Sequence, residues 1–370
     1  MKNQVKKKKN LKNQMPVKKK MMKMIIMIDD EKEDGKTEKE DGEEKDGENK
    51  KKKATCGHNR TEVTEVVLLG FGILHHVKDF IFVLFLLLYL ASIVGNMMVI
   101  TLIKTSPRLH SPMYFFLRNL SACEILFTTV LMPNMLYVIW GNGGTISLYG
   151  CITQLYLGAS IGSAESLLLT MMAYDRYLAI CFPLRYSSVM NNVTCNHLAL
   201  LSWLCGFVML SISIVSICSL QFCGTNTIDH LFCDFDPVLQ ISSSDISDIY
   251  FVKMEGMMIT IPLTLFPFVL IILSYVSIFC AILRISSSGG RQRAFSTCSA
   301  HLVSVCTYFG AIFIIYLAPS ERYSNRLSKM LSLLYTVGIP LLNPIIYSLR
   351  NQEMKESIRS RVFVIIKTKM

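Results

Sequence analysis

The chain has 370 residues, of which 51% are hydrophobic and 18% are charged, and its formal net charge is +11. Soluble globular domains carry charge on about a quarter of their residues, so this composition indicates an integral membrane protein. The positive charge does not indicate nucleic-acid binding, because the lysine clusters come without base-stacking or groove-reading residues.

Residues 1–53 form a charged, low-complexity segment with 18 Lys and 12 Asp or Glu and without an aromatic side chain. A segment of this kind cannot bury a core. We therefore expect residues 1–54 to be a disordered N-terminal extension, or sequence added by an incorrect gene model, and we assign it no function.

Seven apolar segments follow, each long enough to cross about 30 Å of hydrocarbon as a helix. In lipid the backbone must satisfy its own hydrogen bonds, so helices are expected. The segments are Phe80–Ile103, Asn119–Val138, Ile152–Tyr174, His197–Leu220, Gly256–Leu283, Ala294–Pro319 and Met330–Leu349. They predict an all-α membrane protein with a seven-transmembrane helix bundle over residues 55–362 and a short cytoplasmic tail over 363–370.

The charges of the loops predict the orientation of this bundle. With an extracellular N-terminus, the inner loops and C-terminal tail carry 14 Lys or Arg, and the outer segments after residue 53 carry 6. Cytoplasmic loops of membrane proteins are enriched in Lys and Arg, which favours this topology. Asn59 then begins an extracellular glycosylation sequon, whereas the sequon at Asn192 falls in an inner loop and should stay unmodified.

Short motifs at the helix ends identify a family. The stretches GN (95–96), MAYDRYLAIC (172–181) and PLLNPIIY (340–347), with Trp203 in the fourth helix, resemble rhodopsin-like G-protein-coupled receptors. The motifs LHSPMYFFLRNLS (109–121), PLRY (183–186), SY (274–275), RAFSTCSAH (293–301) and NPIIYSLRN (343–351) are more specific, and the set resembles the olfactory receptor family over residues 57–362.

This resemblance implies a multi-pass receptor of the plasma membrane, located in the cilia of olfactory neurons. It would bind a small organic odorant inside the bundle and activate a stimulatory heterotrimeric G protein, which raises cyclic AMP. The alternatives are a receptor for a non-odorant metabolite and a non-functional receptor. A transporter would show paired interrupted helices, and an enzyme would show a phosphate loop, a nucleophile elbow or metal-ligand spacing. We expect neither.

Asp175 and Arg176 place an acid and a base at the end of an apolar helix. Such charges can snorkel to the headgroups as an anchor, but charged side chains within membrane helices usually have a function. The resemblance implies a switch that turns toward the G protein. Its coupling residues are Asp175, Arg176, Tyr177, Tyr275, Arg293, Asn343, Pro344 and Tyr347.

Glu124 and Glu165 lie well inside apolar helices, where an unpaired carboxylate is costly. They are either neutral packing groups or part of a polar core that can hold a sodium ion, since oxygen ligands suit a hard cation. By resemblance this core contains Asn96, Ser121, Glu124, Glu165 and Asn343. We expect no other cofactor. Pro344 removes a backbone hydrogen bond from the seventh helix and predicts a kink or a hinge there.

Cys151 begins the third helix, and Cys223 and Cys233 lie in the second outer loop, where the secretory route permits disulfides. The resemblance implies a bond between Cys151 and Cys233. The family usually has another loop cysteine about ten residues after Cys233, but this chain has Ser242–Ser244 there. Cys223 is therefore either free or paired with Cys56.

The ligand pocket of the family lies between the outer halves of helices three, five and six. The matching positions are Ala159, Gly162, Ser163, Ile259, Thr260, Leu263, Phe309, Ile312 and Tyr316. They are mostly small or apolar, which suits a modest organic ligand, although plain helix packing explains each of them nearly as well. None is acidic or basic, so we expect a neutral ligand. The family commonly has Phe-Tyr-Gly in the sixth helix, whereas this chain has Tyr308-Phe309-Gly310.

Two features near the cytoplasmic side complete the prediction. His301 is either a proton switch or, as we expect, a buried histidine with satisfied hydrogen bonds. The stretch SLRNQEMKESIRS, which follows Tyr347, predicts a short amphipathic helix on the inner membrane surface.

Overall fold

The computed structural model describes residues 61–72, 77–317 and 325–369. The chain divides into residues 1–53 and residues 54–370, and all described residues belong to the second unit. The predictions for residues 1–54 and for Asn59 therefore lie outside the described residues. So do the side chains of Arg293 and Tyr316, although the backbone of both is helical.

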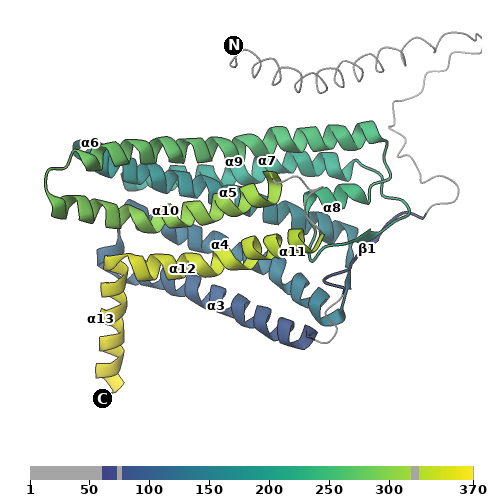
Figure 1. Ribbon diagram of the computed structural model, residues 1–370, viewed down its shortest axis with the longest axis horizontal. Helices are drawn as coiled ribbons and strands as arrows, with labels where there is room; N and C mark the ends of the chain where they lie inside the picture. Colours follow the sequence, from purple (N-terminus) through teal and green to yellow (C-terminus); the bar gives the residue numbers. More distant parts are fainter. Residues whose placement is uncertain (1–60, 73–76, 318–324, 370) are drawn as a thin grey trace, which may run out of the picture. The chain divides into compact units, whose positions relative to one another are not determined.

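Long helices form the bundle (Figure 1). They are α3 (Lys78–Thr105), α4 (Pro112–Gly141), α5 (Leu148–Cys181), α7 (Asn192–Cys218), α9 (Ile246–Leu283), α10 (Ser288–Leu317) and a seventh span divided into α11 (Asn325–Leu333), the π-helical η3 (Leu334–Gly338) and α12 (Ile339–Arg350). Among the described residues, six helical segments are long and apolar enough to cross a membrane, and α10 contains a shorter apolar segment, Cys298–Ile314. The predicted seven-helix bundle is confirmed.

The bundle has a buried centre and an apolar outer surface. Helix α5 packs against α4, α7, α9 and α10 and contributes many of the buried side chains. Helices α3, α7 and α9 instead expose large apolar side chains, such as Phe80, Val215 and Phe251. A surface this apolar suits hydrocarbon rather than water, and a chain of this kind is a multi-pass membrane protein.

A small sheet lies at one end of the bundle and was not predicted. Strand β1 (Glu65–Leu68) pairs antiparallel with β2 (Gly144–Ser147) and parallel with β3 (Thr227–Ile228). Asn142 and Gly143 have positive φ angles of 59° and 125°, which allow the chain to turn from α4 into β2. The segment before the first span is thereby joined to the loops that follow α4 and α7.

The same end contains the loop that precedes α9. Within it, Asp234 caps the N-terminus of the short helix α8 (Phe235–Gln240), and its Oδ1 accepts a hydrogen bond from the Phe235 amide at 2.8 Å. Disulfides form in the secretory route, and this loop contains the disulfide of Cys233. The predicted orientation makes this the extracellular end.

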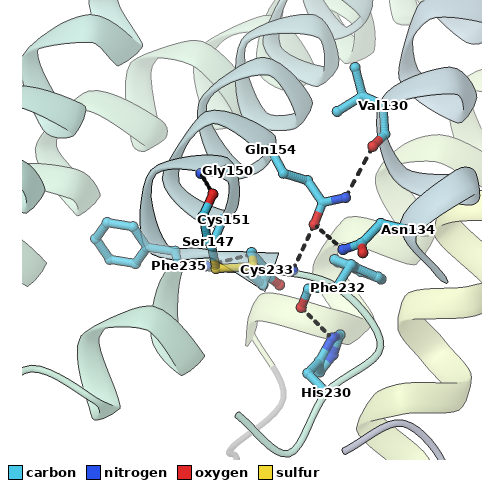
Figure 2. The surroundings of a disulfide bond; sticks show 11 residues. Val130, Asn134, Ser147, Gly150, Cys151, Gln154, His230, Phe232, Cys233 and Phe235 are labelled. Atoms are coloured by element: carbon cyan, nitrogen blue, oxygen red, sulfur yellow. Dashed lines mark hydrogen bonds between the residues drawn. A yellow bond between two sulfur atoms is a disulfide. The ribbon is translucent and has the colours of Figure 1, made fainter. Parts of the chain in front are cut away.

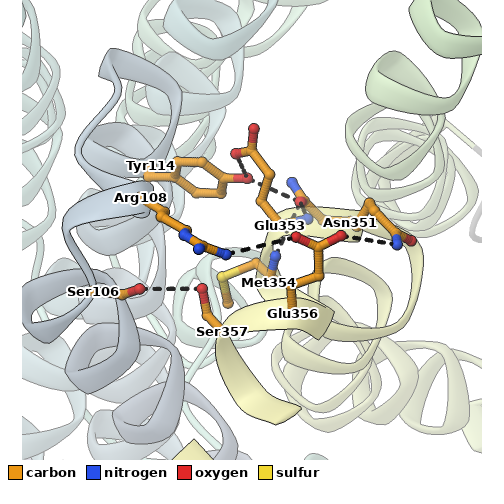
Figure 3. Close-up of polar contacts among 9 residues, drawn as sticks. Ser106, Arg108, Tyr114, Asn351, Glu353, Met354, Glu356 and Ser357 are labelled. Carbon is orange, nitrogen blue, oxygen red and sulfur yellow. Dashed lines mark hydrogen bonds and ion pairs between the residues drawn. The ribbon is translucent and has the colours of Figure 1, made fainter. Parts of the chain in front are cut away.

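The opposite end contains α6 (Pro183–Val189), η1 (Pro107–Leu109) and α13 (Gln352–Lys369), which leaves α12 at a steep angle (Figure 1). The Tyr114 hydroxyl of α4 donates to Glu353 Oε2 at 2.6 Å, and Asn351 Oδ1 lies 2.9 Å from the same hydroxyl (Figure 3). A helix therefore follows the seventh span, as predicted, and polar contacts fasten its beginning to α4.

Candidate functional site

The ion pair of Asp175 and Arg176 lies near the cytoplasmic end of α5. Arg176 donates to Asp175 Oδ2 from Nη2 at 2.6 Å and from Nε at 3.0 Å. Asp175 is fully buried, and the Arg176 side chain is 11% exposed. A simple anchor would extend both groups toward the headgroups, but here the carboxylate is enclosed by protein.

Tyr186 of α6 completes the surroundings of this carboxylate. Its hydroxyl donates to Asp175 Oδ1 at 2.8 Å, so both carboxylate oxygens are occupied. Burial, and then the nearby Asp175, raise the pKa of Tyr186, which keeps this hydroxyl protonated and able to donate. The resemblance implies that polar groups of the sixth helix also hold the arginine, but within the described part of the chain Arg176 donates only to Asp175.

A second contact joins three helices in the cytoplasmic half. Tyr275 of α9 lies 2.7 Å from Nδ1 of His301 on α10, and Nε2 of that ring lies 3.1 Å from the Leu169 carbonyl of α5. A carbonyl can only accept, so Nε2 carries a proton. His301 is therefore buried with a partner at each ring nitrogen, as expected. Tyr177 packs against Phe182 and lies in the same apolar cluster as Tyr275.

The structure brings three of the five predicted polar-core residues together. Asn343 Nδ2 donates to Glu124 Oε1, and the carboxyl groups of Glu124 and Glu165 interact with each other. Glu124 Oε2, Glu165 Oε1 and Asn343 Oδ1 are buried without a hydrogen-bond partner among the described residues. Ser121 is buried one turn before Glu124 on α4. Unsatisfied oxygens of this kind are the donor set that a hard cation prefers.

Asn96 of α3 has a different role in the structure, because it hydrogen-bonds the backbone of the seventh helix. Pro344 has no N–H group to donate to the carbonyl of Pro340. Asn96 Nδ2 donates to that carbonyl at 3.0 Å and to the Ser92 carbonyl at 3.1 Å. A Cβ on Gly95 would lie 3.3 Å from Pro344 Cβ, so the glycine permits the close approach. The GN motif of α3 therefore supports the proline of α12.

Tyr347, one turn after Pro344, is 1% exposed, and its hydroxyl has no hydrogen-bond partner in the part of the chain that the structure describes. The Tyr275 hydroxyl, on the other predicted coupling tyrosine, contacts His301 and the Cys298 carbonyl instead of Tyr347. The role of both tyrosines in switching stays a prediction.

Side chains fill most of the predicted ligand pocket. Ile259 and Leu263 are buried in one apolar cluster, against which Ala159 packs. Phe309 and Ile312 belong to the main core, and the Gly162 carbonyl accepts a hydrogen bond from Tyr308 at 2.6 Å. Thr260 is exposed on the surface of the bundle, and Ser163 is half-buried.

A cavity of about 70 Å³ lies beside this set, between α4, α5, the loop before α8 and the seventh helix. Ala159 lines it, and no other predicted pocket residue whose side chain is described does. Its apolar walls include Phe127, Leu131 and Phe232. Its polar residues are Gln154, Asp234, Ser332, Tyr335 and Thr336. Asp234 was not among the pocket residues predicted from the sequence. It could have been predicted, because it directly follows Cys233, and the expected disulfide to Cys151 brings this part of the loop to the start of the third helix.

The predicted disulfide fastens the loop above this cavity. Cys151 of α5 is bonded to Cys233, with the two Cα atoms 5.4 Å apart. Gln154 Oε1 accepts from the Cys233 amide at 3.1 Å, and its Nε2 donates to the Val130 carbonyl of α4 at 3.0 Å (Figure 2). One glutamine therefore connects the loop to two helices.

Cys223 is also disulfide-bonded in the structure, so the expectation that it might stay free is wrong. The other expectation, pairing with Cys56, concerns a residue outside the described ranges. The serines that replace the usual cysteine fasten the loop by hydrogen bonds. Ser243 Oγ accepts from the Cys223 amide at 3.0 Å, and Ser244 Oγ accepts from the Gln221 amide at 2.7 Å.

Comparisons with known proteins agree with this architecture. A family profile described as "Olfactory receptor" matches residues 85–365. Human olfactory receptor 10A7 is 43% identical over 304 residues, which cover 82% of this chain and 95% of that protein. Mouse olfactory receptor 5P52 is 42% identical over 304 residues, with 82% of this chain and 97% of that protein covered.

The crystal structure of squid rhodopsin is similar with a TM-score of 0.62 and 17% sequence identity, and the match covers 77% of this chain and 80% of that one. At this identity the likeness bears on the fold alone, and it supports the seven-helix bundle. The relatives are receptors rather than enzymes. With the family profile, the curated relatives and the fold in agreement, this chain belongs to the olfactory receptor family of rhodopsin-like G-protein-coupled receptors.

Proposed function

We propose that the protein is an odorant receptor of the plasma membrane. It binds a small, neutral organic odorant within the helix bundle and activates a stimulatory G protein, which raises cyclic AMP. The chemical class of ligand follows from the mostly apolar side chains at the predicted pocket positions. Location in the cilia of olfactory neurons follows from membership of the family.

The observation that carries this proposal is the enclosed pair of Asp175 and Arg176. A charged pair at a membrane boundary needs no protein enclosure if it serves only as an anchor. Here both carboxylate oxygens are held, by Arg176 and by Tyr186. Such an arrangement restrains the arginine in one state and can release it in another, which is what a conformational switch requires.

The polar core is the second part of the proposal. Three buried oxygens of Glu124, Glu165 and Asn343 have no partner among the described residues, and they would hold a sodium ion. The cation would supply the positive charge that allows two interacting carboxylates to ionise together. Because Asn343 adjoins Pro344, movement of the seventh helix would change this donor set, and the ion would favour the resting state.

The test is a cyclic AMP assay with a mixed odorant panel, in cells that express the chain with and without residues 1–54. Arg176→Ala should retain surface delivery and lose at least tenfold in odorant response, because the group that turns toward the G protein is absent. Surface labelling provides the control. Normal signalling by this variant would leave Arg176 as an anchor, and failure of every surface-delivered form across the panel would favour a non-odorant metabolite.

A further inference from the structure

The cavity beneath the disulfide-bonded loop has polar groups that the bundle does not satisfy. Thr336 is fully buried and lines the cavity, and its hydroxyl has no hydrogen-bond partner among the described residues. A buried hydroxyl without a partner costs about 1–3 kcal/mol. A hydroxyl in this condition, on the wall of a cavity, is suited to a hydrogen bond with a ligand.

Asp234 supplies a second polar group on the same cavity. One of its oxygens, Oδ1, accepts from the Phe235 amide at 2.8 Å, which leaves the other oxygen available. The ion pairs of the described residues do not include Asp234. Burial raises the pKa of this carboxyl above its ordinary value, which agrees with a site that is partly shielded from water.

The size of the cavity decides what fits. Pockets that enclose a whole drug-sized ligand measure about 300–1,000 Å³, and this cavity measures about 70 Å³. It has room for one functional group and a short part of a chain. Ala159 lines the cavity and also packs against the cluster of Ile259 and Leu263. The polar end of a ligand can therefore lie beneath the loop with the adjoining carbon atoms at Ala159, and side chains of the predicted pocket would have to move to admit a longer chain.

The two polar residues differ in what they offer. The Thr336 hydroxyl can donate and accept, whereas an ionised Asp234 only accepts. An alcohol oxygen can accept from Thr336 and donate its own proton to Asp234, so a single ligand hydroxyl satisfies both. An ether can accept but cannot donate, and an ammonium group can donate but cannot accept.

We propose that this cavity is the subsite for the hydroxyl group of an aliphatic alcohol, with Thr336 and Asp234 as its hydrogen-bond partners. The proposal rests on the proposed function and deepens it by assigning the polar end of the odorant. It also places the polar end of the odorant between α4, α5 and the seventh helix, under the outer loop. The pocket predicted from the sequence lies instead between α5, α9 and α10, which are the third, fifth and sixth spans.

The test measures binding separately from signalling. The purified full chain is heated with straight-chain alcohols, with methyl ethers of the same alkyl chains or with the corresponding primary amines, and ligand affinity is obtained from the concentration dependence of the thermal midpoint. Alcohols should bind about tenfold more tightly than their methyl ethers. Thr336→Val keeps the shape of the side chain and should weaken alcohol binding about tenfold.

Ser213→Ala is the matched control, because Ser213 of α7 is also a buried hydroxyl without a described partner but does not line the cavity. It should leave alcohol affinity unchanged. Thr336→Val should also leave the unliganded thermal midpoint unchanged or higher, which separates a binding defect from misfolding. Asp234→Asn preserves the cap of α8, since asparagine is an equally good cap, and should reduce the preference for alcohols over ethers.

Several results would overturn the subsite. These are equal binding of alcohols and ethers, equal effects of Thr336→Val and Ser213→Ala, and binding of none of the three ligand series. Tighter binding of amines that is lost in Asp234→Asn would assign the cavity to a cation instead. Alcohol binding without any rise in cyclic AMP would support the subsite while contradicting the proposed signalling.

Discussion

At the scale of single residues, the carboxylate of Asp175 is the group on which the proposed switch depends. It is fully buried and accepts hydrogen bonds from Arg176 on its own helix and from Tyr186 in the adjoining loop helix. The sequence placed the acid beside the base but did not show that Tyr186 of the PLRY motif, eleven residues further on, would complete its surroundings. That contact depends on how α6 folds back on α5.

Tyr186→Phe should raise basal cyclic AMP several-fold. The substitution removes only the hydroxyl, and a buried charged acceptor that loses a hydrogen bond costs about 1–3 kcal/mol. This cost falls on the state in which Asp175 holds Arg176, so the equilibrium moves toward release of the arginine. Basal signalling, normalised to surface expression, provides the measurement.

Tyr149→Phe is the matched control for this prediction. Tyr149 is 78% exposed at the opposite end of α5, and the same loss of a hydroxyl there should leave basal signalling unchanged. If Tyr186→Phe behaves like Tyr149→Phe, the hydroxyl of Tyr186 does not restrain the switch.

At the scale of helices, hydropathy located every span but not its ends. Helix α4 begins at Pro112, seven residues before the predicted Asn119, and α9 begins at Ile246, ten residues before Gly256. Both extensions carry polar or charged residues, such as Arg118 and Lys253, that interrupt an apolar run without ending a helix. The extended α9 contacts the outer loop, where Lys253 pairs with Asp236 at 2.9 Å.

In the seventh helix, too, the sequence predicted that the helix is interrupted but not how the interruption is built. Pro344 predicted an interruption, because proline removes a helix hydrogen bond. The π-helical turn at Leu334–Gly338 and the donation from Asn96 to the Pro340 carbonyl were not predictable, since both depend on how α3 and the seventh helix pack.

Asn96→Leu should lower the thermal stability of the receptor. Leucine matches asparagine in size but cannot donate to the Pro340 carbonyl, which is left unpaired at a cost of about 1–3 kcal/mol. Ser92→Ala, one turn away on the same helix, removes a hydroxyl without a described partner and should cost nothing. Thermal unfolding in sodium-free buffer excludes an indirect effect through the proposed ion. Equal midpoints for the two variants would contradict this role of Asn96.

At the scale of the whole molecule, the outer end is a structure in its own right, made from segments far apart in the chain. The strand before the first span, the turn after α4 and the long loop before α9 share one sheet. Strands this short were not predictable, because a four-residue strand gains its stability from partners that lie about 80 and 160 residues away. Cys233 indicated that the loop before α9 is attached to α5, but nothing in the sequence indicated that this loop forms a sheet with β1 and β2.

Lys329 of α11 joins this outer structure to the seventh helix. Its ammonium group donates to the Gly70 carbonyl at 2.7 Å and to Asp229 Oδ1 at 2.5 Å, and its side chain is 7% exposed. One cation therefore connects the segment before the first span, the outer loop and the last span. A buried ammonium group that donates to a carbonyl as well as to a carboxylate contributes more than a surface ion pair does, although Asp229 itself is 45% exposed.

Lys329→Met should therefore reduce the stability of the receptor by about 2–3 kcal/mol, since methionine retains the apolar stem and removes only the charged donor. Lys253→Met is the comparison, because Lys253 forms an ion pair with Asp236 at 2.9 Å but is itself 44% exposed, against 7% for Lys329, while the two acids are similarly exposed at 59% and 45%. Exposed pairs contribute about 0–1 kcal/mol, so the thermal midpoint should fall clearly for Lys329→Met and hardly at all for Lys253→Met.

Hydrogen exchange of residues 65–68 should also become faster in Lys329→Met alone, because Gly70 lies just after β1. If the two lysine variants have the same thermal midpoint and the same hydrogen-exchange rates in β1, the disulfide and the sheet hold the outer end, and Lys329 adds nothing to its stability.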